Sequence, residues 1–395
     1  MAGTADAAEP TARLEGFLQR LVEDGTVPGA VLVVSGAGTS WEGSTVVCAG
    51  SMAEDGPPMR PDALMRIQSM TKPLTAAATL LAVQEGELRL EDPVLRWLPE
   101  LADRTVLRAH DAELSDVVPA DREITVRDLL VNGCGYGMEM TDSPLARRMM
   151  DLGVSASPDQ TVDVGADEWL RRLATLPLAH QPGEGFRYHH GFSVLGILLQ
   201  RMAGVGLQDH LDRVLFSPLG MEDTSLWVPP EKASRLPAAF RRVDGKLRET
   251  EPLGGGFYVG EPAFDTAHGE LVSTARDYLR FARMLADGGR HAGHRFLDAV
   301  LVAEMTRDQV APQAKTPESM IPGFWDTTGW GYGISVETSG DHPGRLGWSG
   351  GQGTTFLIDP DGTIVVFLSQ VEADERMGAV FQAVHGLAAG PGLPQ

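Results

Sequence analysis

Strand-like segments lie at both ends of the chain, and a long helical stretch separates them. This feature restricts the fold more than any other. Near the start, "AVLVV" (30–34) and "STVVCA" (44–49) predict two strands of a hairpin. Near the end, "GWGYGISVE", "TTFLID" and "TIVVFLS" predict further strands, and an Asp-Pro-Asp-Gly turn (359–362) joins the last two. Strands from the two ends therefore share one sheet, with a helical domain inserted between them.

Apolar spacing predicts the main helices. The apolar residues of segment 14–21 recur at helical spacing, and Gly25 ends this first helix. Further helices are predicted over 69–85, 193–204 and 273–289, the last with Ser273 or Thr274 as its N-cap. We divide the chain accordingly into a sheet domain, residues 1–66 and 241–395, and a mainly helical domain, residues 67–240.

Composition narrows the partners and the compartment. The formal net charge of −21 argues against a nucleic-acid surface or an anionic membrane as partner, because both attract clustered Lys and Arg. The two cysteines, Cys48 and Cys134, form no disulfide framework or metal motif. The N-terminal stretch "MAGTADAAEPTARLEG" has no basic and apolar regions of a signal peptide, and no apolar run reaches the ~18 residues of a membrane span. We expect a cytoplasmic protein.

A nucleophile-elbow motif, G-x-S-x-G, occurs around Ser349. Asp359 or Asp361 and His385 follow it in the order that an α/β-hydrolase triad requires. Such an elbow lies between a strand and a helix, whereas "TTFLIDPDGTIVVFLSQ" after Ser349 predicts a hairpin. The context therefore argues against Ser349 as nucleophile. Its glycine neighbours are better suited to letting a substrate approach a strand.

A second serine has the helical context that the first one lacks. Ser69 and Lys72 form S-x-x-K at the start of a predicted helix, so that the amine reaches the hydroxyl one turn away. The positive end of the helix dipole favours an oxyanion at Ser69. The chain has only four lysines beside 29 arginines, and only a lysine can give up its proton and act as a base. A solvated lysine at a helix start is the alternative interpretation.

Together with Tyr188, which directly precedes an apolar helix, these segments resemble the serine β-lactamase/penicillin-binding-protein superfamily, in particular its class C β-lactamase-like esterases and acyltransferases. The resemblance runs from about Pro28 to Ser369. "SMTKP" resembles the S-x-x-K motif, and "PGEGFRYHH" resembles the Y-x-N motif with its preceding P-G-x-x-[FW]-x-Y. The stretches "SPLGMEDT", "ELVSTARDYLRFARML" and "GWGYGISV" resemble further landmarks. The third motif, K-T-G or H-x-G, falls on Trp348-Ser349-Gly350.

The resemblance implies an α+β fold: a mainly antiparallel sheet flanked by helices, with an inserted helical domain and the active site between them. It also implies covalent catalysis by Ser69, whose hydroxyl attacks an ester carbonyl. Either Lys72, unprotonated, or Tyr188, as a phenolate, takes the proton; both assignments stay open. Tyr188 relays the proton to the leaving alcohol, and the backbone N–H groups of Ser69 and Gly351 hold the oxyanion.

Three departures from the family motifs bear on the substrate. His190 stands where Y-x-N has Asn, "NGCG" (132–135) stands where many relatives have H-T-S-G, and Trp348 replaces the Lys or His of the third motif. In β-lactam-processing relatives that lysine helps to hold the substrate carboxylate, which Trp cannot do. We expect Trp348, His190 and Tyr136 to line the substrate pocket, and Ser349 and Gly350 to form a wall of it.

An esterase acting on a small-molecule ester is therefore the first interpretation. An acyltransferase that moves the acyl group to an alcohol or amine is the second. A β-lactamase or D-amino-acid peptidase follows, and so does a ligand-binding relative without catalysis. The mechanism requires no cofactor. We expect no metal site, because His291 and His294 form a lone pair in a glycine-rich loop. The number of subunits is left open.

Overall fold

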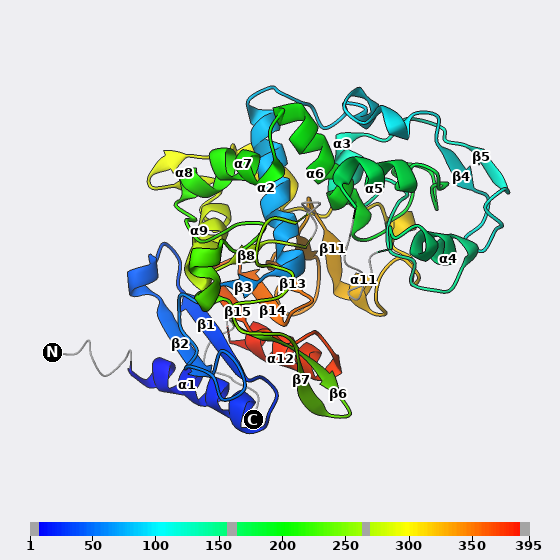
Figure 1. Ribbon diagram of the computed structural model, residues 1–395. Helices are drawn as coiled ribbons and strands as arrows, with labels where there is room; N and C mark the ends of the chain where they lie inside the picture. Colours follow the sequence, from blue (N-terminus) through cyan, green and yellow to red (C-terminus); the bar gives the residue numbers. More distant parts are fainter. Residues whose placement is uncertain (1–7, 156–163, 263–268, 388–395) are drawn as a thin grey trace.

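A seven-stranded antiparallel sheet forms the centre of the protein (Figure 1). The computed structural model describes residues 8–155, 164–262 and 269–387. The strand order is β11-β12-β13-β14-β15-β1-β2. In chain order these strands are β1 (Gly29–Ser35), β2 (Thr45–Gly50), β11 (Thr328–Trp330), β12 (Ser335–Glu337), β13 (Leu346–Gly350), β14 (Thr354–Ile358) and β15 (Ile364–Leu368).

Strands from the two ends of the chain pair directly. β1 lies between β2 and β15, with Val33 opposite Val366 in the β1–β15 ladder. The predicted shared sheet is therefore confirmed, as is the α+β fold class. Strand residues of β15 are buried on both faces, which explains why "IVVFL" is a continuous apolar run rather than an alternating one.

One predicted strand is a hairpin instead. "GWGYGISVE" folds into β11 and β12, which pair with each other around a tight turn. Gly333 in this turn has φ +71°, and a Cβ there would lie 2.7 Å from the carbonyl oxygen of Lys72. The expectation of one strand was wrong because the turn must pack against the first turn of α2 (Thr71–Gln84), far earlier in the chain, and only glycine fits so closely.

Helices cover both faces of the sheet. α9 (Ala275–Ala286) packs on β15, β1 and β14, whereas α1 (Ala8–Glu23) contacts β2 and β1 and α12 (Glu375–Gly386) contacts β15. The side chains of β1 alternate between these layers: Val31 and Val33 share a cluster with α9, and Ala30 and Leu32 share one with α1 and α12. The first helix is thus where the sequence predicts it.

The middle of the chain is mainly helical. Besides α2, it contains α3 (Val126–Leu130), α4 (Pro144–Asp151), α5 (Ala166–Leu173), α6 (His190–Ala203), α7 (Leu207–Leu211) and α8 (Ser217–Leu219). Two short helices, α10 (Ala299–Met305) and α11 (Phe324–Thr327), precede β11. Short two-stranded ladders are β3 (Met65–Arg66) with β8 (Val272–Ser273), β4 (Thr105–Leu107) with β5 (Val117–Pro119), β6 (Ala239–Val243) with β7 (Lys246–Glu251) and β9 (Arg290–His291) with β10 (His294–Arg295).

One hydrophobic core joins the sheet to the helical part. It includes Val366 and Val33 of the sheet, Leu80 of α2, and Leu195 and Leu198 of α6. In Figure 1, α2 lies beside α6, with which it is in contact. The core thus crosses the boundary at residues 66 and 67, and the division into two domains stays a prediction.

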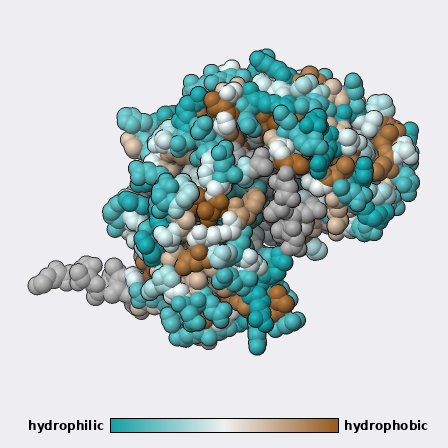
Figure 2. Space-filling model, viewed as in Figure 1, coloured by the Kyte–Doolittle hydropathy of each residue, from teal (hydrophilic) through white to brown (hydrophobic). Residues whose placement is uncertain are grey.

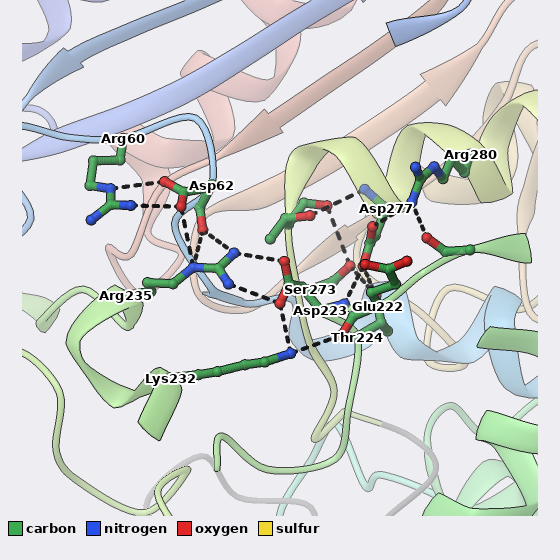
Figure 3. A network of polar contacts seen from close by, with 12 residues as sticks. Arg60, Asp62, Glu222, Asp223, Thr224, Lys232, Arg235, Ser273, Asp277 and Arg280 are labelled. Atoms are coloured by element: carbon green, nitrogen blue, oxygen red, sulfur yellow. Dashed lines mark hydrogen bonds and ion pairs between the residues drawn. The ribbon is translucent and has the colours of Figure 1, made fainter. Parts of the chain in front are cut away.

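A polar network fixes the start of α9 (Figure 3). Thr274 is the N-cap, since its side chain accepts a hydrogen bond from the Asp277 N–H. Asp277 in turn accepts hydrogen bonds from the backbone N–H of Asp223, at 2.7 Å, and from the Thr224 hydroxyl. Asp223 forms ion pairs with Arg235 and with Lys232. The network therefore attaches the segment after α8 to the helix that supports the sheet.

Hydrophilic side chains predominate on the face of the molecule shown in Figure 2. No helix in the described ranges combines the length and the apolar character needed to cross a membrane. Both cysteines are free thiols. Residues 1–7 of the N-terminal stretch "MAGTADAAEPTARLEG" lie outside the described residues.

Candidate active site

Ser69 lies in a 3₁₀ turn, Gln68–Met70, that leads into α2. Hydrogen bonds from distant elements hold this turn. The Ile67 N–H donates to the Leu271 carbonyl at 3.0 Å, and the hydroxyl of Tyr278 on α9 donates to the Met70 carbonyl at 2.9 Å. The side chain preceding the nucleophile is that of Gln68, which has φ +48° and donates to the Tyr258 hydroxyl at 2.7 Å. The serine is thus presented from a rigid, locally strained turn.

Lys72 lies within hydrogen-bond distance of Ser69 and can accept its proton. Its Nζ lies 3.0 Å from the Ser69 Oγ, within the distance that a general base requires. The lysine side chain is fully buried, and this burial lowers its pKa well below the usual value. The ring of Tyr188, 4.4 Å from Nζ, favours the charged form but does not outweigh the loss of solvation. The amine is therefore suited to act as a neutral base.

Tyr188 occupies the irregular segment before α6 and faces both Ser69 and β13. Its hydroxyl accepts a hydrogen bond from Trp348 Nε1 at 2.8 Å. Burial raises the pKa of Tyr188 far above the usual value, while hydrogen bonds with Ser69 and Trp348 act in the opposite direction and are weaker. Near neutral pH the side chain is therefore a phenol, a proton donor rather than a phenolate base.

The end of β13 lies against the nucleophile turn. A Cβ on Gly350 would lie 2.2 Å from the Ile67 carbonyl oxygen, so only glycine permits this close approach. β12 pairs with β13 only at Leu346 and Gly347, which leaves the other end of β13 beside Ser69. Gly351 follows β13. Its carbonyl accepts a hydrogen bond from the Ala373 N–H at 2.8 Å, which fixes the Gly351–Gln352 peptide. Gly351 and Gln352 line the same cavity as Ser69.

A cavity of about 430 Å³ contains Ser69, Tyr188 and Gly351 in its wall. One part of the wall comes from the helical region and includes the apolar side chains of Met138, Val154 and Trp169. The other part carries two ion pairs, Arg66 with Glu251 and Arg241 with Glu372. An ester bound at Ser69 would therefore meet both apolar side chains and ion-paired ones.

His190 is the predicted pocket residue that does line this cavity. Its Nε2 donates to the Val154 carbonyl at 2.6 Å, and its ring stacks on Trp169 with the centroids 5.9 Å apart. Burial and the nearby Lys72 lower the pKa of His190 to about 4, so the imidazole is neutral at physiological pH. It therefore supplies no positive charge to the site.

Three other predicted pocket residues lie elsewhere, and their positions correct the expectation. Tyr136 is packed in the helical region, where its hydroxyl donates to the Leu176 carbonyl at 3.3 Å. The Ser349 hydroxyl donates to Thr355 at 2.9 Å, and Thr355 is bound in turn to His385 of α12. Ser349 thus faces α12, because neighbouring strand residues point to opposite sides of the sheet. Gly350 packs against the nucleophile turn rather than bordering the cavity.

Trp348 supports Tyr188 instead of lining the cavity. Its indole lies edge-to-face with Trp330 at 4.5 Å between ring centroids, and Phe324 packs beside it. Sequence reasoning did not foresee this support, nor the roles of Tyr278 and Trp169. Trp169 lies outside any motif, so only its aromatic character could have singled it out.

No group of three or more potential ligands capable of holding a metal ion occurs among the described residues. His291 and His294 lie opposite each other in the β9–β10 ladder. The arrangement around Ser69 can perform acyl transfer with protein groups: a nucleophile, a neutral amine beside it, and a phenol that can donate a proton.

Comparison with known proteins agrees with this geometry. The family model described as Beta-lactamase matches residues 14–384. Esterase EstB of Burkholderia gladioli is 31% identical over 377 residues, which cover 90% of this chain and 88% of EstB. Protein Rv1367c of Mycobacterium tuberculosis (strain ATCC 25618 / H37Rv) is 35% identical over 367 residues, covering 89% and 88% of the two chains.

A solved structure supports the fold over nearly the whole length. EstCE1, described as a hydrolase with promiscuous acyltransferase activity, superimposes with a TM-score of 0.79 at 24% identity and covers 97% of this chain and 100% of its own. The family match spans the sheet, the helical region and all three motif segments. From its sequence, fold and site geometry, the chain belongs to the Beta-lactamase family.

Proposed function

We propose that this protein is a serine esterase that hydrolyses carboxylic esters of small molecules through an acyl-enzyme on Ser69. The observation that carries the proposal is the 3.0 Å contact between Ser69 Oγ and a buried Lys72 amine at the wall of a cavity. Ester-cleaving relatives such as EstB support the same chemistry. Only a neutral amine can take the serine proton, and burial favours that form.

The steps follow from the positions of these groups. Ser69 Oγ attacks the ester carbonyl carbon while Lys72 Nζ takes the hydroxyl proton. The backbone N–H groups of Ser69 and Gly351 stabilise the negative oxygen of the tetrahedral intermediate. The Tyr188 hydroxyl donates its proton to the departing alkoxide and recovers one from the Lys72 ammonium. Water then attacks the acyl-enzyme by the same route, which releases the acid and restores Ser69.

Acyl transfer is the second candidate function. The cavity of about 430 Å³ carries both apolar and charged side chains in its wall, which gives an alcohol or amine acceptor room beside the acyl group. EstCE1 is itself described as having promiscuous acyltransferase activity. Cleavage of β-lactams is disfavoured, because the two arginines in the cavity wall, Arg66 and Arg241, already pair with glutamates and Trp348 brings no charge to bind a carboxylate.

Intact mass spectrometry tests the proposal. The protein is mixed with p-nitrophenyl butyrate, with and without butanol or butylamine, and Ser69→Ala serves as the control. An adduct of one butyryl group that decays in water supports the esterase. An adduct that persists in water and decays only with the acceptor supports the transferase. An adduct that also forms on Ser69→Ala, or the absence of both an adduct and p-nitrophenol release in the wild type, contradicts the assignment of Ser69.

A further inference from the structure

Asn132 is hydrogen-bonded to the segment that carries Tyr188. It follows α3, has φ +56°, and is fully buried. Asparagine tolerates this left-handed conformation better than most residues, but glycine tolerates it best. A buried asparagine at such a position therefore points to a use for its side chain.

Two hydrogen bonds from Asn132 flank Tyr188. The Asn132 carbonyl oxygen accepts from the Arg187 N–H at 2.8 Å, and its side-chain Oδ1 accepts from the His189 N–H at 3.2 Å. A third bond, from the Met138 N–H to the Tyr188 carbonyl at 2.8 Å, holds the segment from the other side. One residue thus binds both chain neighbours of the tyrosine.

His189 shows why this support is needed. Its φ of +95° and ψ of −66° are unfavourable for a residue with a side chain, and such strain persists only where the surroundings impose it. The bond to Asn132 Oδ1 holds the strained peptide that connects Tyr188 to α6. Without that acceptor the peptide is free to relax, and the Tyr188 ring moves with it.

We propose that Asn132 is a positioning residue that keeps the Tyr188 hydroxyl in line with Ser69 and the leaving group. This inference rests on the proposed function, in which Tyr188 protonates the departing alkoxide. A misplaced proton donor slows the loss of a poor leaving group more than that of a good one, because p-nitrophenolate departs without a proton and ethoxide does not.

The test compares Asn132→Gly with the wild type on ethyl butyrate and p-nitrophenyl butyrate. Glycine keeps the backbone conformation and the carbonyl acceptor but removes Oδ1. We expect kcat/KM for the ethyl ester to fall about 10- to 100-fold, and that for the aryl ester to fall only a few fold. The ratio of the two values cancels the fraction of folded enzyme. Asp103→Gly, at another left-handed residue with φ +53°, is the matched control and should leave the ratio unchanged.

Asn132→Asp retains an acceptor at the same place and should keep the wild-type ratio; a ratio as low as that of Asn132→Gly would contradict the proposal. Equal losses on both esters in Asn132→Gly would also overturn it. Tyr188→Phe separates this failure from failure of the proposed function. If Tyr188→Phe lowers the ratio and Asn132→Gly does not, only the positioning role is wrong. If Tyr188→Phe leaves the ratio unchanged, the proton-donor role of Tyr188 is wrong, and the positioning proposal falls with it.

Discussion

Trp348 Nε1 donates a hydrogen bond to the hydroxyl oxygen of Tyr188 at 2.8 Å, across 160 residues of sequence. An indole N–H can only donate, so the tyrosine oxygen must act as the acceptor in this contact. The phenolic proton is then directed away from Trp348 and is available to Ser69 or to a leaving group. The contact thus favours Tyr188 as a proton donor, in agreement with the pKa of Tyr188 that burial raises.

Ser69 and Ser349 each lie in a sequence motif typical of serine hydrolases, and mutation of each shows which one is the nucleophile. We expect Ser69→Ala to reduce ester hydrolysis by roughly 10⁴-fold or more, because the nucleophile is lost. Ser349→Ala should keep kcat/KM within a few fold, since its hydroxyl bonds to Thr355 on the side of the sheet that faces α12. Steady-state kinetics on one ester measure both variants. Loss of activity in Ser349→Ala with survival in Ser69→Ala would contradict the assignment.

Lys72→Met should lower kcat/KM strongly and raise the melting temperature at pH 7. The unfolded chain carries this lysine protonated, with a pKa of about 10.4, whereas burial lowers the pKa in the folded state. Folding must therefore release a proton, so the lysine costs stability increasingly as the pH falls from about 10 toward its folded pKa. Methionine of similar length removes that cost. Thermal unfolding of Lys72→Met, with the exposed Lys246→Met as control, measures the effect.

Lys72→Arg tests the same residue for catalysis. Arginine keeps a positive charge but cannot give up its proton, so it should lower kcat/KM about as much as Lys72→Ala, by some 10²- to 10⁴-fold. Substantial activity in Lys72→Arg would identify Lys72 as a structural cation, and the proposed base would be wrong.

The motifs of the site could be found in the sequence because they are local. Ser69 and Lys72 are one helical turn apart, and their contact at 3.0 Å follows from that spacing once the segment begins a helix. The shared sheet was predictable for a similar reason, since apolar runs at both ends must find partners. The sequence alone argued against placing both Trp348 and Ser349 at the pocket, because neighbouring strand residues point to opposite faces of the sheet. In the structure Trp348 faces Tyr188, and Ser349 faces α12.

The remaining features depend on packing between distant segments. The bond from Tyr278 to the Met70 carbonyl spans 208 residues, and no local pattern indicates it. Tyr136 was expected in the pocket, yet the fold buries its ring, and its hydroxyl donates to the Leu176 carbonyl. The hairpin at Gly333 forms because α2 lies against it. Each outcome is decided by which surfaces meet in three dimensions.

Asp277, at the start of α9, should make the protein less stable as the pH rises through 6. Burial raises the pKa of Asp277 from 3.8 to about 6, so the carboxyl contributes stability below pH 3.8 that is lost as the pH passes the folded pKa. A shift of about two units corresponds to at most about 3 kcal/mol. Asp277→Asn keeps an acceptor for Asp223 and cannot ionise. Urea unfolding at pH 5 and pH 8 should show a smaller decline for the variant than for the wild type; an equal decline would contradict the assignment.

The pH dependence of hydrolysis distinguishes Lys72 from Tyr188 as the base. If the neutral Lys72 amine takes the proton, kcat/KM rises with pH through the lowered pKa of Lys72 and then stays level to about pH 10, because Tyr188 remains protonated throughout. Trp348→Phe removes the hydrogen bond that lowers the pKa of Tyr188, so that pKa rises further. We expect the maximal kcat/KM of the variant to be about tenfold lower, because the phenol is no longer oriented. The rising limb of the pH profile should stay at the same pH. If the Tyr188 phenolate were the base, the rising limb would move to higher pH in Trp348→Phe. Profiles of both proteins with ethyl butyrate, corrected for spontaneous hydrolysis, give the answer.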